Sequence, residues 1–381
     1  MLSRAAGSQG MTTDAAGAGR SSLLLRLILL CALLFGFFVG LDMMGLSFKL
    51  FGKGFAEGLI ERTSNPFVGL FVGILATTLV QSSSTTTSMI VALVAAGALT
   101  IEGAIPMVMG ANIGTSVTNT LVSLAHVTRR EEFQRAFAGA TVHDFFNWLA
   151  VLILLPLELA TGYLARSATF FETVLEGAGG FRLFDPLKAV VRPVSSGLAE
   201  LFGNSGILVL IVGVGLLIAS LKFLVDLLKV LMTGRAEATL HRTLFRSAMA
   251  AATAGLVVTV MVQSSSITTS LMVPLVGAGV VTLEQIFPFT IGANIGTTVT
   301  AMLAALSTGS PAAVSVALSH LIFNLSAAVL IYVPKPIRAI PLTLAKTLGK
   351  MAARNRLLAA AYILVFFFGL PILLLLLTGA L

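Results

Sequence analysis

The sequence predicts an all-α integral membrane protein made of two inverted repeats, each with three transmembrane helices and a re-entrant or broken helical hairpin, plus one extra C-terminal helix. Composition indicates the class: hydrophobic residues make up 57% of the chain and charged residues 10%, against about a quarter charged in soluble domains. A duplication indicates the repeats. The polar run at 81–88 returns at 263–270, and the Gly-Ala-Asn-Ile-Gly-Thr motif at 110–115 returns at 292–297. Across residues 81–120, 23 of 40 positions match their partners without a gap, which marks an internal repeat.

The first half begins with a segment, residues 1–20, whose small and polar composition predicts disorder. The apolar stretch 23–40 is too long for a typical signal-peptide core and lacks a small-residue cleavage pattern, so it is the first predicted span. Mixed charge over 49–62 predicts an amphipathic helix in the membrane interface. A straight helix over 66–97 would place eight consecutive Gln, Ser and Thr residues near mid-membrane. A hairpin or broken helix that lines a cavity is therefore predicted there.

The remaining elements follow the same plan in both halves. Spans over 105–124 and 137–157 complete the first transmembrane repeat, residues 21–160. A Gly- and Pro-punctuated extracytoplasmic linker is expected over 161–204. The second repeat, residues 205–334, has predicted spans at 207–228, 286–306 and 314–332 and a hairpin at 247–279. A basic amphipathic segment (335–356) and a C-terminal transmembrane helix (357–381) follow, and the helix has no counterpart in the first half.

The odd number of spans in each repeat predicts the inverted arrangement, because the second repeat must then enter the membrane from the opposite side. With the N-terminus in the cytoplasm, 17 of the 24 Lys and Arg residues lie at cytoplasmic positions and 7 outside. This distribution agrees with the positive-inside rule. The excess positive charge is therefore a topology signal, and no nucleic-acid partner is expected.

The polar runs are the candidate site. A break in a membrane helix exposes backbone N–H groups at the partly positive start of the next half-helix, and Ser, Thr and Gln side chains add donors. Such a tip suits a multiply charged oxyanion. The alternative is that small hydroxyl residues only pack helices. The residues predicted to bind the anion are Gln81, Ser82, Ser83, Ser84, Gln263, Ser264, Ser265 and Ser266.

A small hard cation such as sodium suits the freed carbonyls and hydroxyl oxygens of the same breaks. The glycines of the 110–115 motif also permit a packed kink, and both roles can hold. Two His-x-x-x-Asn pairs, 143/147 and 320/324, each lie on one helix face and are interpreted as structural hydrogen bonds to a neighbouring helix. The residues predicted to bind sodium are Thr85, Thr86, Asn112, Thr115, Asp144, Thr268, Thr269, Asn294 and Thr297.

Several function classes are disfavoured. Cys31 is the only cysteine, so the chain can form neither an internal disulfide nor a multi-thiolate metal site. The four His residues lack metal-ligand spacing. There is no nucleotide-binding loop and no catalytic carboxylate pair, so neither an enzyme nor a cofactor is expected, apart from sodium as a coupling ion.

The doubled motifs resemble those of the type II sodium-dependent phosphate cotransporters, whose mark is two copies of Gln-Ser-Ser-Ser, each followed by a Gly-Ala-Asn-Ile-Gly-Thr type motif. The similarity also runs through Arg-Ala-Phe-Ala-Gly-Ala-Thr-Val-His-Asp at 135–144 and covers about residues 23–332. It implies sodium-coupled uptake of inorganic phosphate across the plasma membrane. The animal members have a long, disulfide-bearing loop between the repeats and a regulatory tail. This chain has neither, and so resembles a compact prokaryotic-type member.

Asp144 is a further candidate because a carboxylate inside a transmembrane span is costly and is by default functional. Its partner in the second repeat is Leu321, although the flanking His and Asn are kept in both halves. Asp144 could instead pair with His143 or a nearby Arg. The resemblance implies that members with Asp at this position bind an additional sodium and move net charge, whereas members with Gly do not. The alternatives to a phosphate symporter are a sodium-coupled transporter of another small anion and an anion channel.

Overall fold

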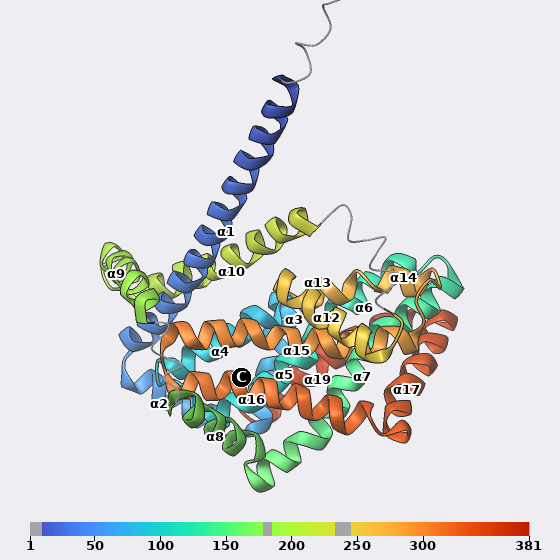
Figure 1. Ribbon diagram of the computed structural model, residues 1–381. Helices are drawn as coiled ribbons and strands as arrows, with labels where there is room; N and C mark the ends of the chain where they lie inside the picture. The colour runs from blue at the N-terminus through green and yellow to red at the C-terminus, as the bar shows by residue number, and fades with distance from the viewer. Residues whose placement is uncertain (1–9, 178–184, 233–244, 381) are drawn as a thin grey trace, which may run out of the picture.

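The computed structural model describes residues 10–177, 185–232 and 245–380, and every regular element within these ranges is helical (Figure 1). Six of these helices are long and apolar enough to cross a membrane, so the predicted all-α membrane fold is confirmed. They are Leu25–Phe51, Arg130–Thr161, Gly206–Leu224, Leu283–Thr308, Pro311–Tyr332 and Arg356–Leu377.

The first half contains α1 (Gly10–Phe51), α2 (Lys53–Thr63), α3 (Pro66–Val80), α4 (Ser83–Ala95), α5 (Ile101–Thr115), α6 (Val117–Ser123) and α7 (Arg130–Thr161). Residues 10–20, for which disorder was predicted, are the start of α1, and residues 1–9 lie outside the described part of the chain. The predicted interfacial helix corresponds to α2, which meets α3 at a bend of 101°. Asn65 caps α3 by accepting a hydrogen bond from the backbone N–H of Phe67, and Pro66 occupies the first turn.

The predicted span over 105–124 is not one continuous helix. It breaks at Ser116 between α5 and α6, and η1 (Leu124–His126), a 3-10 turn, ends it. The matching residue of the second repeat, Thr298, lies inside the unbroken helix α15 (Leu283–Thr308). Hydrophobicity alone did not distinguish these two segments, because they are almost equally apolar.

The second half follows two linker helices, α8 (Tyr163–Gly177) and α9 (Asp185–Leu201); residues 178–184 of the predicted linker lie outside the described ranges. It comprises α10 (Gly206–Met232), α12 (Ala248–Val262), α13 (Ser265–Ser270), α14 (Val273–Gly277), α15 and α16 (Pro311–Ala327), with the π-turn η3 (Ala328–Tyr332). The chain ends with α17 (Lys335–Arg354), α18 (Arg356–Leu364), the π-turn η4 (Val365–Gly369) and α19 (Leu370–Leu377). Both predicted hairpins are thus present as helices broken at their polar centres.

Glycine lets the two hairpins dock in the same way in the two halves. A Cβ added to Gly110 of α5 would stand 2.0 Å from the carbonyl oxygen of Leu70 in α3, and one added to Gly292 of α15 would stand 1.8 Å from that of Ala252 in α12. Only glycine permits this backbone approach. The first glycine of each Gly-Ala-Asn-Ile-Gly-Thr motif therefore has a packing role, which supports one of the two roles expected for these motifs.

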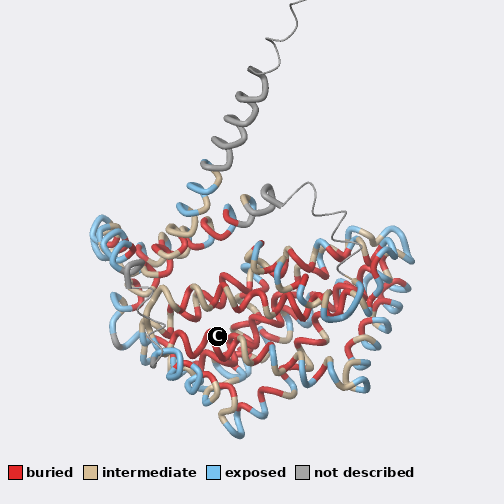
Figure 2. The backbone as a smooth tube through the Cα atoms, viewed as in Figure 1, coloured by how far each residue is buried: buried red, intermediate tan, exposed pale blue. Residues whose placement is uncertain are grey.

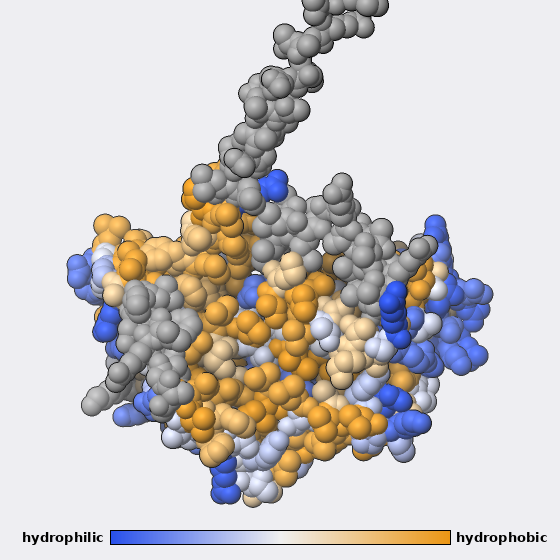
Figure 3. Space-filling view, in the orientation of Figure 1, coloured by the Kyte–Doolittle hydropathy of each residue, from blue (hydrophilic) through white to orange (hydrophobic). Residues whose placement is uncertain are grey.

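The buried core runs through the middle of the molecule, along α4, α5, α15 and α16 (Figure 2). On the visible surface, hydrophobic residues gather over the middle of the face, and hydrophilic residues concentrate at the right-hand edge, near α14 and α17 (Figures 1 and 3). An apolar band with a polar edge is the surface that a bilayer requires.

Candidate functional site

Both hairpin tips have the same local geometry. Gln81 ends α3 and Gln263 ends α12, each in the left-handed backbone region with φ of 55° and 56°. Non-glycine residues rarely adopt this conformation outside turns and functional sites. The next residue caps the following helix: Ser82 Oγ accepts from the backbone N–H of Thr85, and Ser264 Oγ accepts from that of Ile267. The sequence Gln-Ser therefore turns the chain at each tip.

The two tips meet. Ser84 Oγ donates to the carbonyl oxygen of Gln263, 3.1 Å away and 179 residues later in the chain. A cavity of about 400 Å³ lies between the tips. Its polar lining comes from both repeats and from α10, and consists of Gln81, Ser82, Thr85, Thr118, Lys222, Asp226, Gln263, Ser264 and Ser266.

Five of the eight residues predicted to bind the anion line this cavity, namely Gln81, Ser82, Gln263, Ser264 and Ser266. The other three, Ser83, Ser84 and Ser265, are buried behind the tips. The Ser265 hydroxyl has no hydrogen-bond partner among the described residues. Gln263 is fixed by its own side chain, which donates to Val260 O and accepts from the Thr300 hydroxyl at 2.7 Å.

The threonines predicted to bind sodium are mostly tied to their own helices. In each case the hydroxyl donates to an oxygen three or four residues earlier, as in Thr85 Oγ1 to Ser82 Oγ at 2.9 Å. A hydroxyl whose proton is committed in this way still presents lone pairs, which is the property a cation ligand needs. Of this group, only Thr85 lines the cavity. The others with such bonds are Thr86, Thr115, Thr268, Thr269 and Thr297.

Asn112 and Asn294, called here the exchanged asparagines, each hydrogen-bond to the His-x-x-x-Asn pair of the other repeat. Asn294 Oδ1 pairs with His143 Nε2 at 2.7 Å, and its Nδ2 donates to Asn147 Oδ1 at 2.8 Å. In the mirrored arrangement, Asn112 Oδ1 pairs with His320 Nε2 at 3.0 Å and its Nδ2 donates to Asn324 Oδ1 at 2.9 Å. The two His-x-x-x-Asn pairs make the predicted hydrogen bonds to neighbouring helices, and each pair binds the asparagine of the other repeat.

Asp144 is fully buried on α7, next to the break between α5 and α6. Its Oδ2 accepts a hydrogen bond from the hydroxyl of Tyr362 at 3.0 Å. The Ser116 hydroxyl also lies within hydrogen-bonding reach. Oδ1 has no partner among the described residues, and no ion pair within that part of the chain includes Asp144. Among the described residues, Asp144 therefore does not form the alternative pair with His143 or an arginine.

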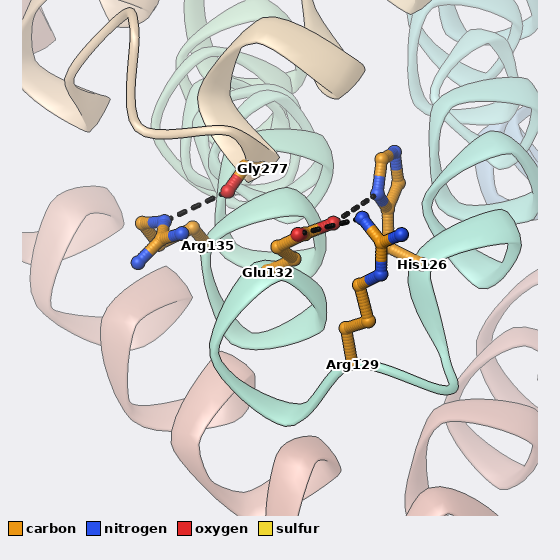
Figure 4. Close-up of polar contacts among 5 residues, drawn as sticks. All are labelled: His126, Arg129, Glu132, Arg135 and Gly277. Atoms are coloured by element: carbon orange, nitrogen blue, oxygen red, sulfur yellow. Dashed lines mark hydrogen bonds and ion pairs between the residues drawn. The ribbon is translucent and has the colours of Figure 1, made fainter.

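The far end of the second hairpin is tied to α7 (Figure 4). Arg135 Nε donates to the carbonyl oxygen of Gly277, at the end of α14, at 2.8 Å. One turn earlier on α7, Glu132 accepts from Arg129 at 3.0 Å and faces His126 at 3.4 Å. The Arg135 contact anchors the base of the hairpin, whereas the tip borders the cavity.

Sequence reasoning missed four residues around the site: Thr118, Lys222, Asp226 and Tyr362. Lys222 and Asp226 stand four residues apart inside a predicted span, and charge in such a place is a signal that could have been used. Thr118 lies just beyond the duplicated motif, and its hydroxyl has no partner among the described residues. Nothing in the sequence shows that Tyr362 reaches Asp144, which lies 218 residues earlier.

Comparison with known proteins agrees with this geometry. The family profile described as Na+/Pi-cotransporter matches residues 36–161 and 216–373, which together are most of the chain and include both tips. The chain belongs to the Na+/Pi-cotransporter family. Its members are transporters, and with several membrane-length helices this Na+/Pi-cotransporter family protein is a multi-pass membrane protein.

Curated relatives support the same assignment. The chain is 35% identical over 444 residues to sodium-dependent phosphate transport protein 2B of Homo sapiens, covering 91% of this chain and 64% of that protein. It is 37% identical over 428 residues to sodium-dependent phosphate transport protein 2A of Mus musculus, covering 91% of this chain and 67% of the relative. The chain thus spans about two thirds of the length of these relatives. No solved structure matches it.

Proposed function

We propose that this protein is a secondary symporter that couples sodium entry to the uptake of inorganic phosphate across the plasma membrane, and that it is not an enzyme. One observation carries the proposal most directly. The duplicated Gln-Ser-Ser-Ser tips, 182 residues apart, border one cavity in a protein of the Na+/Pi-cotransporter family. The printed names of the relatives, sodium-dependent phosphate transport proteins 2A and 2B, give the substrate and the coupling ion.

The chemistry of the cavity suits phosphate. Two Gln amides and several Ser hydroxyls can donate hydrogen bonds to its oxygens, and α4 begins at the first tip with its partly positive end. The cavity wall also carries one basic side chain, Lys222, together with the carboxylate of Asp226. A dianion gains more from this set of donors than a neutral solute of similar size would.

Sodium has two candidate places. The Thr85 hydroxyl offers lone pairs at the cavity, and Asp144 offers a carboxylate beside the break at Ser116. An uncompensated carboxylate in a low-dielectric site attracts a cation strongly. Asp144 would thus add one positive charge to each transport cycle, making it electrogenic.

The two halves form inverted repeats in this proposal, with the N-terminus in the cytoplasm. Asn112 contacts the second repeat in the same way that Asn294 contacts the first, as expected for two halves related by a two-fold axis. Because each repeat has three spans, the second repeat enters from the opposite side, and this axis lies in the membrane plane. The cavity reaches the surface beside Lys222 and Asp226, both of which are exposed. This topology assigns that end of α10 to the cytoplasm.

Uptake of labelled phosphate into proteoliposomes tests the function. We expect saturable uptake that requires an inward sodium gradient and that arsenate inhibits more strongly than sulfate. Replacement of Ser83 or Ser265 by Leu should abolish uptake while the protein remains folded in the membrane, because each residue lies directly behind a tip. Uptake without a sodium requirement would favour a channel, and stronger inhibition by sulfate would favour another anion.

Charge movement tests the role of Asp144. Wild-type transport should respond to an imposed membrane potential, whereas Asp144→Gly should carry phosphate with about one fewer positive charge per cycle. A mutant with unaltered charge per phosphate would contradict sodium binding at Asp144 but not phosphate transport itself.

A further inference from the structure

The C-terminal helix α18 has no counterpart in the first repeat, yet one of its side chains reaches the candidate site. Tyr362 is buried, and its hydroxyl donates to Asp144 Oδ2 at 3.0 Å. Its ring lies against four phenylalanines, with centroid distances from 4.8 to 6.3 Å: Phe137, Phe145, Phe366 and Phe367. The packing of the ring fixes the position of the hydroxyl and so maintains its hydrogen bond to Asp144.

Three features that break the symmetry of the duplication meet at this spot. The carboxylate of Asp144 is replaced by Leu321 in the second repeat. The helix break at Ser116 is absent at Thr298. The tyrosine comes from a helix that lies outside both repeats. Because all three occur together and only once, they form one asymmetric site, whereas the hairpin tips are present in duplicate.

Resting on the proposed sodium role of Asp144, we propose that Tyr362 is a positioning residue for a cation site that is completed by α18. Tyr362 binds one carboxylate oxygen and leaves Oδ1 without a partner among the described residues, so one oxygen remains for a cation. Because the donor is neutral, it orients the carboxylate without cancelling its charge. A lysine or arginine in its place would remove the reason for a cation to bind.

The other groups near Asp144 leave this arrangement intact. His143, its neighbour on α7, is turned to Asn294 and Asn119. From the α5–α6 break comes the neutral hydroxyl of Ser116. The Ser116 hydroxyl donates to Ile113 O at 2.8 Å, so Tyr362 is the donor that supports the negative charge of Asp144, and its loss lets protons compete better with sodium for the carboxylate.

Tyr362→Phe tests the proposal, because it removes the hydroxyl and keeps the ring. The readouts are the sodium concentration for half-maximal phosphate uptake and its dependence on pH. We expect weaker sodium activation at neutral pH, recovery at higher pH, and a pH profile shifted upward by about one pH unit. Tyr163→Phe is the matched control, since that tyrosine hydroxyl bonds to the Ser326 hydroxyl at 2.9 Å rather than to a carboxylate. It should leave the profile unchanged.

Combination with Asp144→Gly separates the two proposals. If Tyr362 acts through Asp144, Tyr362→Phe should have no further effect on sodium activation in the Asp144→Gly background. A Tyr362→Phe protein with a wild-type pH profile, or one that only loses maximal rate, would overturn the positioning role while the role of Asp144 stands. Unaltered charge per phosphate in Asp144→Gly alone would overturn the sodium role.

Discussion

Replacement of the exchanged asparagines distinguishes a structural role, in which they hold the two repeats together, from a role as sodium ligands. Asn294→Ala removes the partner of His143 Nε2, at 2.7 Å, and of Asn147 Oδ1, at 2.8 Å. Asn112→Ala makes the equivalent change in the mirrored arrangement. If the asparagines mainly tie the repeats together, both variants should lose stability by similar amounts. If they mainly ligate sodium, both should lose the stabilisation that sodium provides.

The size of the effect follows from the groups left behind. Interhelical hydrogen bonds in membranes contribute about 0.6 kcal/mol each, so two lost bonds give about 1.2 kcal/mol. Each variant also strands two buried polar atoms, at about 1–3 kcal/mol each when nothing replaces the partner. These terms sum to about 3–7 kcal/mol. Because water can enter the space of the missing amide and relieve part of the penalty, we expect a loss in the free energy of unfolding at the low end of this range, about 3 kcal/mol.

Unfolding in detergent can be followed through Trp148, the only tryptophan, which is adjacent to Asn147 on α7. Each variant would be titrated with denaturing detergent with and without sodium, and the sodium-dependent stabilisation compared with that of wild type. We expect the loss without sodium to be about equal in the two variants and the stabilisation by sodium to be retained. A variant that unfolds like wild type without sodium but is no longer stabilised by it would refute the structural reasoning.

Three further predictions concern packing, substrate and topology. Gly110→Ala should destabilise the protein by about 3 kcal/mol or more, because the new methyl group would overlap a carbonyl oxygen of α3. Gly215→Ala is the control and should be tolerated, since a Cβ there has nothing within 4 Å; thermal unfolding of both variants measures the difference. Lys222→Gln should raise the phosphate concentration for half-maximal uptake severalfold, and the difference from wild type should shrink at high ionic strength if it is electrostatic. Cysteines placed at residues Thr128 and Thr308, in a background without the native cysteine, should react with a membrane-impermeant reagent from opposite sides; reaction from the same side would contradict the inverted topology.

The sequence was sufficient for the parts of the fold that depend on repetition and hydrophobicity. The run of eight Gln, Ser and Thr residues predicted a break in the first hairpin, and the duplication predicted the same break in the second. The structure forms each break locally, as a left-handed Gln followed by a capping Ser. The four-residue spacing of His143 and Asn147 indicated a bond to a neighbouring helix for a similar reason.

Long-range pairing could not be predicted in this way. Neither the exchange of asparagines between repeats nor the contact from Tyr362 to Asp144 has a local signature, since each depends on how helices distant in sequence pack. The break at Ser116 was missed because it lies within a run that is as apolar as an unbroken span. The sequence also could not show which serines of each run face the cavity, because successive helical residues point in different directions: five of the eight predicted anion-binding residues line it and three are buried beside it.

The exchanged asparagines also set the order in which the chain can fold. Asn112 leaves the ribosome about 200 residues before its partners His320 and Asn324, and His143 waits about 150 residues for Asn294. During that interval the first repeat lies in the bilayer with unsatisfied polar groups on its helices. Such groups retain water or a temporary partner until the second repeat arrives. Assembly of the two repeats is therefore a late and non-local step of biogenesis, dominated by contacts of large sequence separation. A chain released after its first repeat would expose to lipid the polar side chains that the complete protein encloses.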